Sequence, residues 1–141
     1  MSDEPLVSVV LIGFNDVGRI GRALESIRRQ TLRSIEIIVV DDASTDGTAE
    51  FVESVAVSDS RIRLLSRSEN SGGCSAPRND GLRMARAPWV MFCDSDDEYD
   101  MHACATLLRA AEEWNADVVC GTAIRHDVAR DRDKRRRPEL H

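Results

Sequence analysis

Short apolar runs alternate with amphipathic segments along this chain of 141 residues, and this alternation constrains its fold most. Each apolar run is long enough for a buried strand. Each following segment repeats apolar residues at three- and four-residue steps, which is typical of a helix packed on a sheet. Strands are expected at residues 7–14, 35–40, 62–65, from 89 and at 118–124, with helices starting near residues 17, 48, 77 and 101. This order predicts an α/β domain with a mostly parallel sheet.

The first helix shows the pattern most clearly. Val17, Ile20, Leu24 and Ile27 form one apolar stripe, and Asn15-Asp16 is the expected N-terminal cap.

The stretch from Trp89 to Asp100 is an apolar run that ends in five carboxylates within seven residues. The run predicts a strand covered on both faces, with a ligand at its carboxyl end. Carboxylates this close repel one another unless a cation or hydrogen-bond donors neutralise them. A hard divalent ion, Mg²⁺ or Mn²⁺, is the simplest partner. The alternative is a solvated acidic loop that caps the helix starting near Met101.

Three strand ends are expected to meet at one edge of the sheet: Phe14-Asn15, Asp41-Asp42 and Asp94-Ser95-Asp96. Between them in the chain lies the polar loop of residues 70–79, which leads into a helix. Such a loop offers backbone N–H groups to an anion, and Arg78 adds a charged donor. Carboxylates that can bind a cation are thus expected opposite donors that can bind an anion. This combination predicts a site for a metal ion and a diphosphate.

Composition narrows the functional classes. The net charge is −6, and an acidic chain is a poor partner for nucleic acid. No run is long and apolar enough to cross a membrane, and Ser2-Asp3-Glu4-Pro5 is unlike a signal peptide, so a cytoplasmic protein is expected.

Charged residues dominate from Arg125, which predicts a domain at 1–124 and a charged tail, or the start of a missing acceptor-binding part, at 125–141. The basic run at 134–137 could touch anionic lipid, which would place the protein peripherally at the membrane.

The four cysteines show neither C-x-x-C pairing nor histidines at zinc spacing, so they are expected to be reduced.

Four motifs occur in one order: VSVVLIGFN at 7–15, EIIVVDDASTDGT at 36–48, NSGGCSAPRNDGLRMA at 70–85 and FCDSDDEYD at 92–100. Together they resemble the motifs of family 2 glycosyltransferases of the GT-A fold, which read Tyr-Asn, VVDDGSTDGT, N-x-G-G-x-x-A-A-R-N-x-G and DSDD. The similarity covers about residues 7–124. It implies a GT-A fold, a Rossmann-like three-layer sandwich, present here in truncated form.

The resemblance also implies roles for individual residues. Asp42 is similar to the acid that hydrogen-bonds the base of a nucleotide-sugar, and Asp96 to the ligand of Mn²⁺ or Mg²⁺, with Asp94 beside it. The residues implied in nucleotide-sugar binding are Phe14, Asn15, Asp42, Arg78, Asn79 and Asp94. A UDP-sugar is the favoured donor, and the acceptor would be a hydroxyl of a glycan, a lipid or another molecule. In this chain, Ile12-Gly13 stands where the family usually has Pro-Thr.

Inverting enzymes of this kind take a general base from the half of the domain that follows the metal motif. Only 45 residues follow Asp96 here. We therefore expect the chain to bind donor without a catalytic base of its own.

Two other classes of protein are alternatives. Gly18-Arg19-Ile20-Gly21 after a strand, with acids at Asp41 and Asp42, is similar to part of the fingerprint of an NAD-dependent dehydrogenase. Asp16 stands where the first glycine should be, and its carboxylate would repel the pyrophosphate. A receiver-like signalling module is a poorer match, because its expected lysine is missing and the sole lysine is Lys134.

Overall fold

The computed structural model describes residues 4–127 and 132–136 and confirms the α/β class. The chain divides into two compact units, Met1–Ala105 and Thr106–His141. The predicted domain boundary at residue 124 remains a prediction. In the described ranges, no helix has the length and apolar character needed to cross a membrane.

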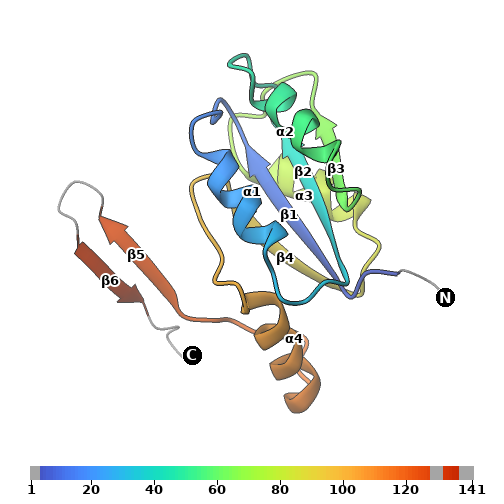
Figure 1. The fold of residues 1–141 in the computed structure, drawn as a ribbon, viewed down its shortest axis with the longest axis vertical. Helices are drawn as coiled ribbons and strands as arrows, with labels where there is room; N and C mark the ends of the chain where they lie inside the picture. The colour runs from blue at the N-terminus through green and yellow to red at the C-terminus, as the bar shows by residue number, and fades with distance from the viewer. Residues whose placement is uncertain (1–3, 128–131, 137–141) are drawn as a thin grey trace. The chain divides into compact units, whose positions relative to one another are not determined.

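A parallel sheet of four strands forms the centre of the first unit (Figure 1). Its order is β3-β2-β1-β4. The strands are β1 (Val7–Gly13), β2 (Ile35–Asp41), β3 (Ile62–Ser66) and β4 (Trp89–Asp94). Every residue of β1 and β2 is buried, which agrees with their nearly continuous apolar sequences.

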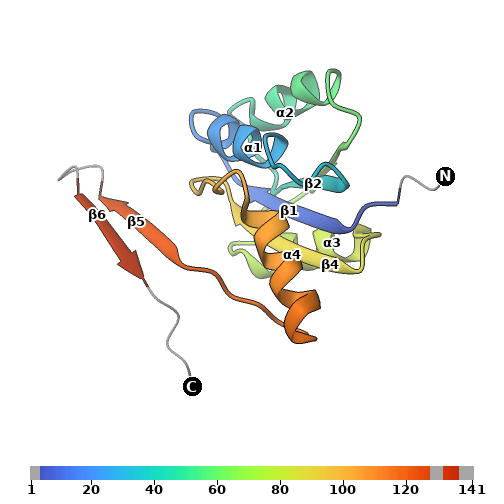
Figure 2. The ribbon, with the colours of Figure 1, turned by 60° about the horizontal axis from the view of Figure 1, so that its bottom comes forward.

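Helices cover both faces of this sheet (Figure 2). They are α1 (Ile20–Arg28), α2 (Thr48–Ala56) and α3 (Ser75–Met84). Val10 and Ile12 of β1 pack in a cluster with Met84 at the end of α3. Successive side chains of a strand point to opposite faces, so Val9 and Leu11 face α1 and α2 instead. The first unit is thus the predicted three-layer arrangement.

The first helix starts later than the sequence predicts. It begins at Ile20, its N-cap is Arg19, and no side chain caps it. The side chain of Asn15 instead accepts a hydrogen bond from Thr45 N at 2.8 Å. Asp16 contributes only its carbonyl, which accepts from the amides of Arg19 and Ile20 at 2.9 Å each. The predicted cap was wrong because tertiary contacts use both side chains.

The prediction that β4 is covered on both faces was also wrong. Most of its residues are only half-buried, and Phe92 is 44% exposed. In the part of the chain that the structure describes, β4 pairs with β1 alone. An apolar run predicts a strand, but its neighbours depend on other segments of the chain.

The second unit contains most of helix α4 (Ala103–Trp114) and a hairpin of β5 (Ala123–Asp127) and β6 (Arg132–Arg136). The strand predicted at residues 118–124 was wrong. Residues 118–122 are not in a strand, and Val118 is 79% exposed. Residues 123–127 pair antiparallel with β6 in a separate sheet of two strands, so they do not add a fifth parallel strand.

Gly81 lets α3 lie close to the sheet, and its replacement tests this packing. A Cβ at Gly81 would lie 2.3 Å from Val10 Cγ1. We expect Gly81→Ala to lower the free energy of unfolding by about 1–3 kcal/mol, because overpacking outweighs the gain in helix propensity. Urea denaturation measures this. Gly18→Ala is the matched control, since a Cβ there meets no atom within 4 Å. An equal loss in both variants would contradict the assignment.

Candidate functional site

The register of the parallel sheet brings three strand ends together. Gly13 at the end of β1 pairs with Asp41 of β2, and Ile12 pairs with Asp94 of β4. Polar side chains follow each of these strands. The predicted meeting of these strand ends at one edge is therefore confirmed.

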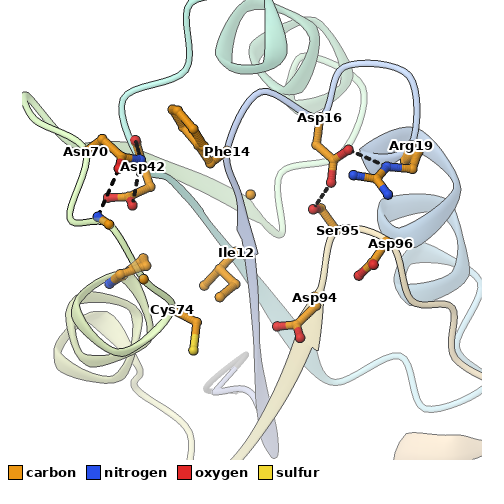
Figure 3. Close-up of a pocket in the computed structure, with 14 residues that line it drawn as sticks. Ile12, Phe14, Asp16, Arg19, Asp42, Asn70, Cys74, Asp94, Ser95 and Asp96 are labelled. Atoms are coloured by element: carbon orange, nitrogen blue, oxygen red, sulfur yellow. Dashed lines mark hydrogen bonds and ion pairs between the residues drawn. The ribbon is translucent and has the colours of Figure 1, made fainter.

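A cavity of about 470 Å³ lies at this edge (Figure 3). Phe14, Asp42, Asp94 and Asp96, all predicted from the sequence, line it. The other lining residues are Ile12, Gly13, Asp16, Arg19, Asn70, Gly72, Gly73, Cys74, Pro77 and Ser95. Polar groups from β1, β2, β4 and the loop before α3 thus face one hollow.

Asp42 is buried and surrounded by donors. Its carboxylate accepts hydrogen bonds from Asn70 Nδ2 at 3.1 Å, from Ser71 N at 3.1 Å and from Ser71 Oγ at 2.8 Å. Arg67 Nε lies 2.8 Å from Asp42 Oδ1 in an ion pair. These contacts fix the carboxylate at the cavity wall and tie the loop before α3 to the end of β2.

Phe14 offers an aromatic surface at the same end of the cavity. It is 48% exposed, and Figure 3 places its ring beside Asp42 and Asn70. Asn15 and Asn79 do not line the cavity. Asn15 holds the turn after β2 through Thr45, and Asn79 is exposed on α3.

Arg78 reaches the site from α3 without lining the cavity itself. Its Nη2 donates to Asp94 Oδ1 at 2.7 Å, and its Nη1 donates to Cys74 Sγ at 3.4 Å. The hydrogen bond to Asp94 and the charge of that carboxylate raise the pKa of Arg78 above its ordinary value. Arg78 is therefore a fixed positive charge beside the acidic segment.

The acidic segment holds three carboxylates that could share a cation. Asp94, Asp96 and Asp97 each offer an oxygen, and these oxygens lie within 4.8 Å of one another. Burial and the neighbouring carboxylates of Asp96 and Asp94 raise the pKa of Asp97. An all-carboxylate set is suited to Mg²⁺ or Mn²⁺. The sequence prediction named Asp94 and Asp96 as ligands and did not include Asp97.

Asp16, Arg19 and Ser95 also line the cavity, although the sequence did not predict them as site residues. Asp16 Oδ1 lies 2.5 Å from Arg19 Nε, and Ser95 Oγ donates to Asp16 Oδ2. One signal could have identified Asp16, because it follows the first strand at the edge where the other acids were expected.

Known glycosyltransferases resemble this chain over most of its length. The family model described as glycosyl transferase family 2 matches residues 8–140. The glycosyltransferase GlyG of Streptococcus pneumoniae is 36% identical over 86% of this chain and 40% of its own length. The poly(ribitol-phosphate) beta-N-acetylglucosaminyltransferase TarP of Staphylococcus aureus is 35% identical over 82% of the chain and 36% of its own length. The chain therefore spans at most about two fifths of these relatives.

Solved structures agree with these matches. Staphylococcus aureus TarS in complex with UDP-GlcNAc superposes with a TM-score of 0.74 at 31% identity, over 79% of this chain and 32% of that one. The mannosyltransferase PcManGT of Pyrobaculum calidifontis, in complex with GDP-Man and Mn²⁺, superposes with a TM-score of 0.68 at 29% identity, over 84% of this chain and 34% of that one. These relatives give no support to the dehydrogenase alternative. The chain belongs to the family 2 glycosyltransferases, and its first unit has their GT-A fold.

Proposed function

We propose that the cavity binds a nucleotide-diphospho-sugar, with a UDP-sugar favoured, together with a divalent metal ion. One observation carries the proposal: a buried carboxylate and an aromatic ring lie at one end of the cavity, and the carboxylates of the acidic segment lie at the other (Figure 3). The similarity to TarS bound to UDP-GlcNAc and to PcManGT bound to GDP-Man and Mn²⁺ supports it.

Asp42 is assigned to the base. An ionised carboxylate has about four lone-pair sites, and Asn70, Ser71 and Arg67 already approach them, so an imide N–H such as that of uracil would replace one of these donors. Phe14 would pack against the ring of the base. Asn15 would act indirectly, by holding the turn that follows Asp42.

Asp94, Asp96 and Asp97 are assigned to the metal. Among the described residues, no side-chain hydrogen bond or ion pair is recorded for the carboxylates of Asp96 and Asp97. Neither is held in an ion pair with a described residue, although the charge of Asp96 also acts on Arg19, whereas Asp94 holds Arg78 directly. When bound, a divalent cation would neutralise the charge that grows on the leaving diphosphate. Arg78 and Asn79, at the start of α3, are placed to approach the same diphosphate or the sugar.

The transfer step itself is proposed for the whole protein. The acceptor hydroxyl would lose its proton to a general base as it attacks the anomeric carbon, and the nucleotide would leave from the opposite side, which inverts the configuration. No catalytic base is assigned in this chain. Donor binding is the part of the reaction that the cavity accounts for.

Asp96→Asn tests the metal assignment. We expect metal-dependent UDP binding to weaken at least about tenfold, since even a disturbed hydrogen-bond partner of a ligand costs about that much. Calorimetry with UDP and Mn²⁺ measures the affinity. Glu98→Gln is the matched control, because Glu98 lies in the same acidic run but outside the group of three. Unchanged affinity in Asp96→Asn would refute the assignment.

Asp42→Ala tests the base assignment. Loss of a charged acceptor is worth about 1.5–3 kcal/mol, so UDP affinity should fall roughly 10- to 100-fold while its dependence on Mn²⁺ persists. Binding of Mn²⁺ with pyrophosphate, which has no base, should be unchanged. An equal loss for pyrophosphate would show that Asp42 acts on the whole site rather than on the base.

Cysteine alkylation tests occupancy of the cavity. Cys74 lines it and is exposed, as is Cys120, which does not line it. Burial raises the pKa of Cys93 to about 12 and that of Cys104 to about 11, so both should stay unmodified near neutral pH. We expect UDP with Mn²⁺ to slow iodoacetamide labelling of Cys74 and not of Cys120, as read by peptide mass spectrometry. Equal rates with and without UDP would contradict binding in this cavity.

A further inference from the structure

Asp16 lies between the loop after β1 and the acidic segment that follows β4. Its carboxylate accepts a hydrogen bond from Ser95 Oγ. Ser95 is the residue between Asp94 and Asp96. We propose that Asp16 is a positioning residue: through Ser95 it holds the backbone of the acidic segment so that the carboxylates of Asp94 and Asp96 converge on one cation. This inference rests on the proposed function.

Ser95 is well placed to transmit this restraint. Its hydroxyl is bonded to Asp16, and it is 8% exposed, whereas Asp96 is exposed and Asp94 is half-buried. A Cβ at Gly13 would lie 3.5 Å from Ser95 Cβ, an ordinary van der Waals distance, so Ser95 lies close to the end of β1. Figure 3 shows Ser95 pointing to Asp16 and the side chains of Asp94 and Asp96 lying below it.

The acidic segment needs such a restraint. The carboxylates of Asp94, Asp96 and Asp97 offer oxygens within 4.8 Å of one another, and like charges at this spacing repel. The backbone contact recorded at this turn is short-range, from Asp97 N to Asp94 O at 3.0 Å. The hydrogen bond from Ser95 to Asp16 joins residues 79 apart in the chain, so it fixes the turn relative to β1.

Asp16 is itself firmly held. It is 7% exposed, its backbone N–H donates to Thr48 Oγ1 at 3.0 Å, and its Oδ1 pairs with Arg19 Nε at 2.5 Å. These contacts anchor it to the starts of α1 and α2. A fixed acceptor can position Ser95, whereas a mobile surface carboxylate could not.

The test compares Asp16→Ala, Ser95→Ala and the double variant. Two constants are measured: the Kd for Mn²⁺ at saturating UDP, by electron paramagnetic resonance of free Mn²⁺, and the Kd for UDP in EDTA. We expect each single variant to raise the Kd for Mn²⁺ about tenfold. The Kd of the double variant for Mn²⁺ should be no higher than that of the weaker-binding single variant, because the two single substitutions remove the same hydrogen bond. The Kd for UDP in EDTA should be unchanged. A general loosening of the site would raise it.

Asp46→Ala is the matched control. Asp46 holds the same loop through Val17 N at 3.1 Å and the start of α2 through Thr48 N at 3.0 Å, but it has no recorded contact with Ser95. Asp46 also accepts from the hydroxyl of Thr48, which in turn accepts from Asp16 N, so it restrains the same loop without touching Ser95. Its Kd for Mn²⁺ should rise less than that of Asp16→Ala or Ser95→Ala, because the hydrogen bond from Ser95 to Asp16 remains. An equal loss in Asp46→Ala, fully additive losses in the double variant, or unchanged Mn²⁺ affinity in folded Ser95→Ala would overturn the inference.

The same measurements separate this inference from the proposed function. If the wild-type chain bound UDP with no dependence on Mn²⁺, the metal site would be wrong and the positioning role would fail with it. If the wild type showed that dependence and Asp96→Asn lost it, while Ser95→Ala matched the wild type, only the role of Asp16 would be overturned.

Discussion

The pairing of β1 with strands on both sides is the constraint on which the site depends. Gly13 pairs with Asp41 on one side, and Ile12 pairs with Asp94 on the other. A shift of one residue in either register would turn Asp42 or Asp94 toward the opposite face of the sheet. Both faces of β1 and β2 are buried, so apolar burial alone does not select the register. A polar contact does: Ser8 Oγ donates to Glu36 Oε1 at 2.6 Å between two residues that pair across the strands.

Much of this architecture can be predicted from the sequence. The apolar runs identified β1 to β4. In the predicted helical stripe, Ile20, Leu24 and Ile27 are buried as expected, whereas Val17 precedes the helix and is 43% exposed. Phe14, Asp42, Asp94 and Asp96 meet at one cavity because the carboxyl ends of parallel strands share an edge. These predictions depend only on local sequence patterns and on one rule of sheet topology. They do not depend on which side chains contact one another in the folded chain.

The errors have the opposite character. Residues 118–122 are as apolar as a strand, yet they form none, and β5 pairs with β6 at residues that were expected to form a charged tail. The capping role expected of Asn15 and Asp16 was wrong, because their side chains accept hydrogen bonds from Thr45 and Ser95, which lie far along the chain. A local pattern shows that a residue can pair or cap, but only the fold determines which partner it meets.

The acidic residues at the site also differ in ways that the sequence does not show. In the sequence they form one group of similar charges, but the structure gives each a different environment. Asp42 has Arg67 and Asp94 has Arg78, and each pairing offsets part of the cost of removing a carboxylate from water. Asp96 and Asp97 lie beside Asp94 with no such partner recorded in the described part of the chain. The unbalanced negative charge is therefore concentrated at the end of β4, and a cation there would supply the counter-charge that arginines supply to Asp42 and Asp94.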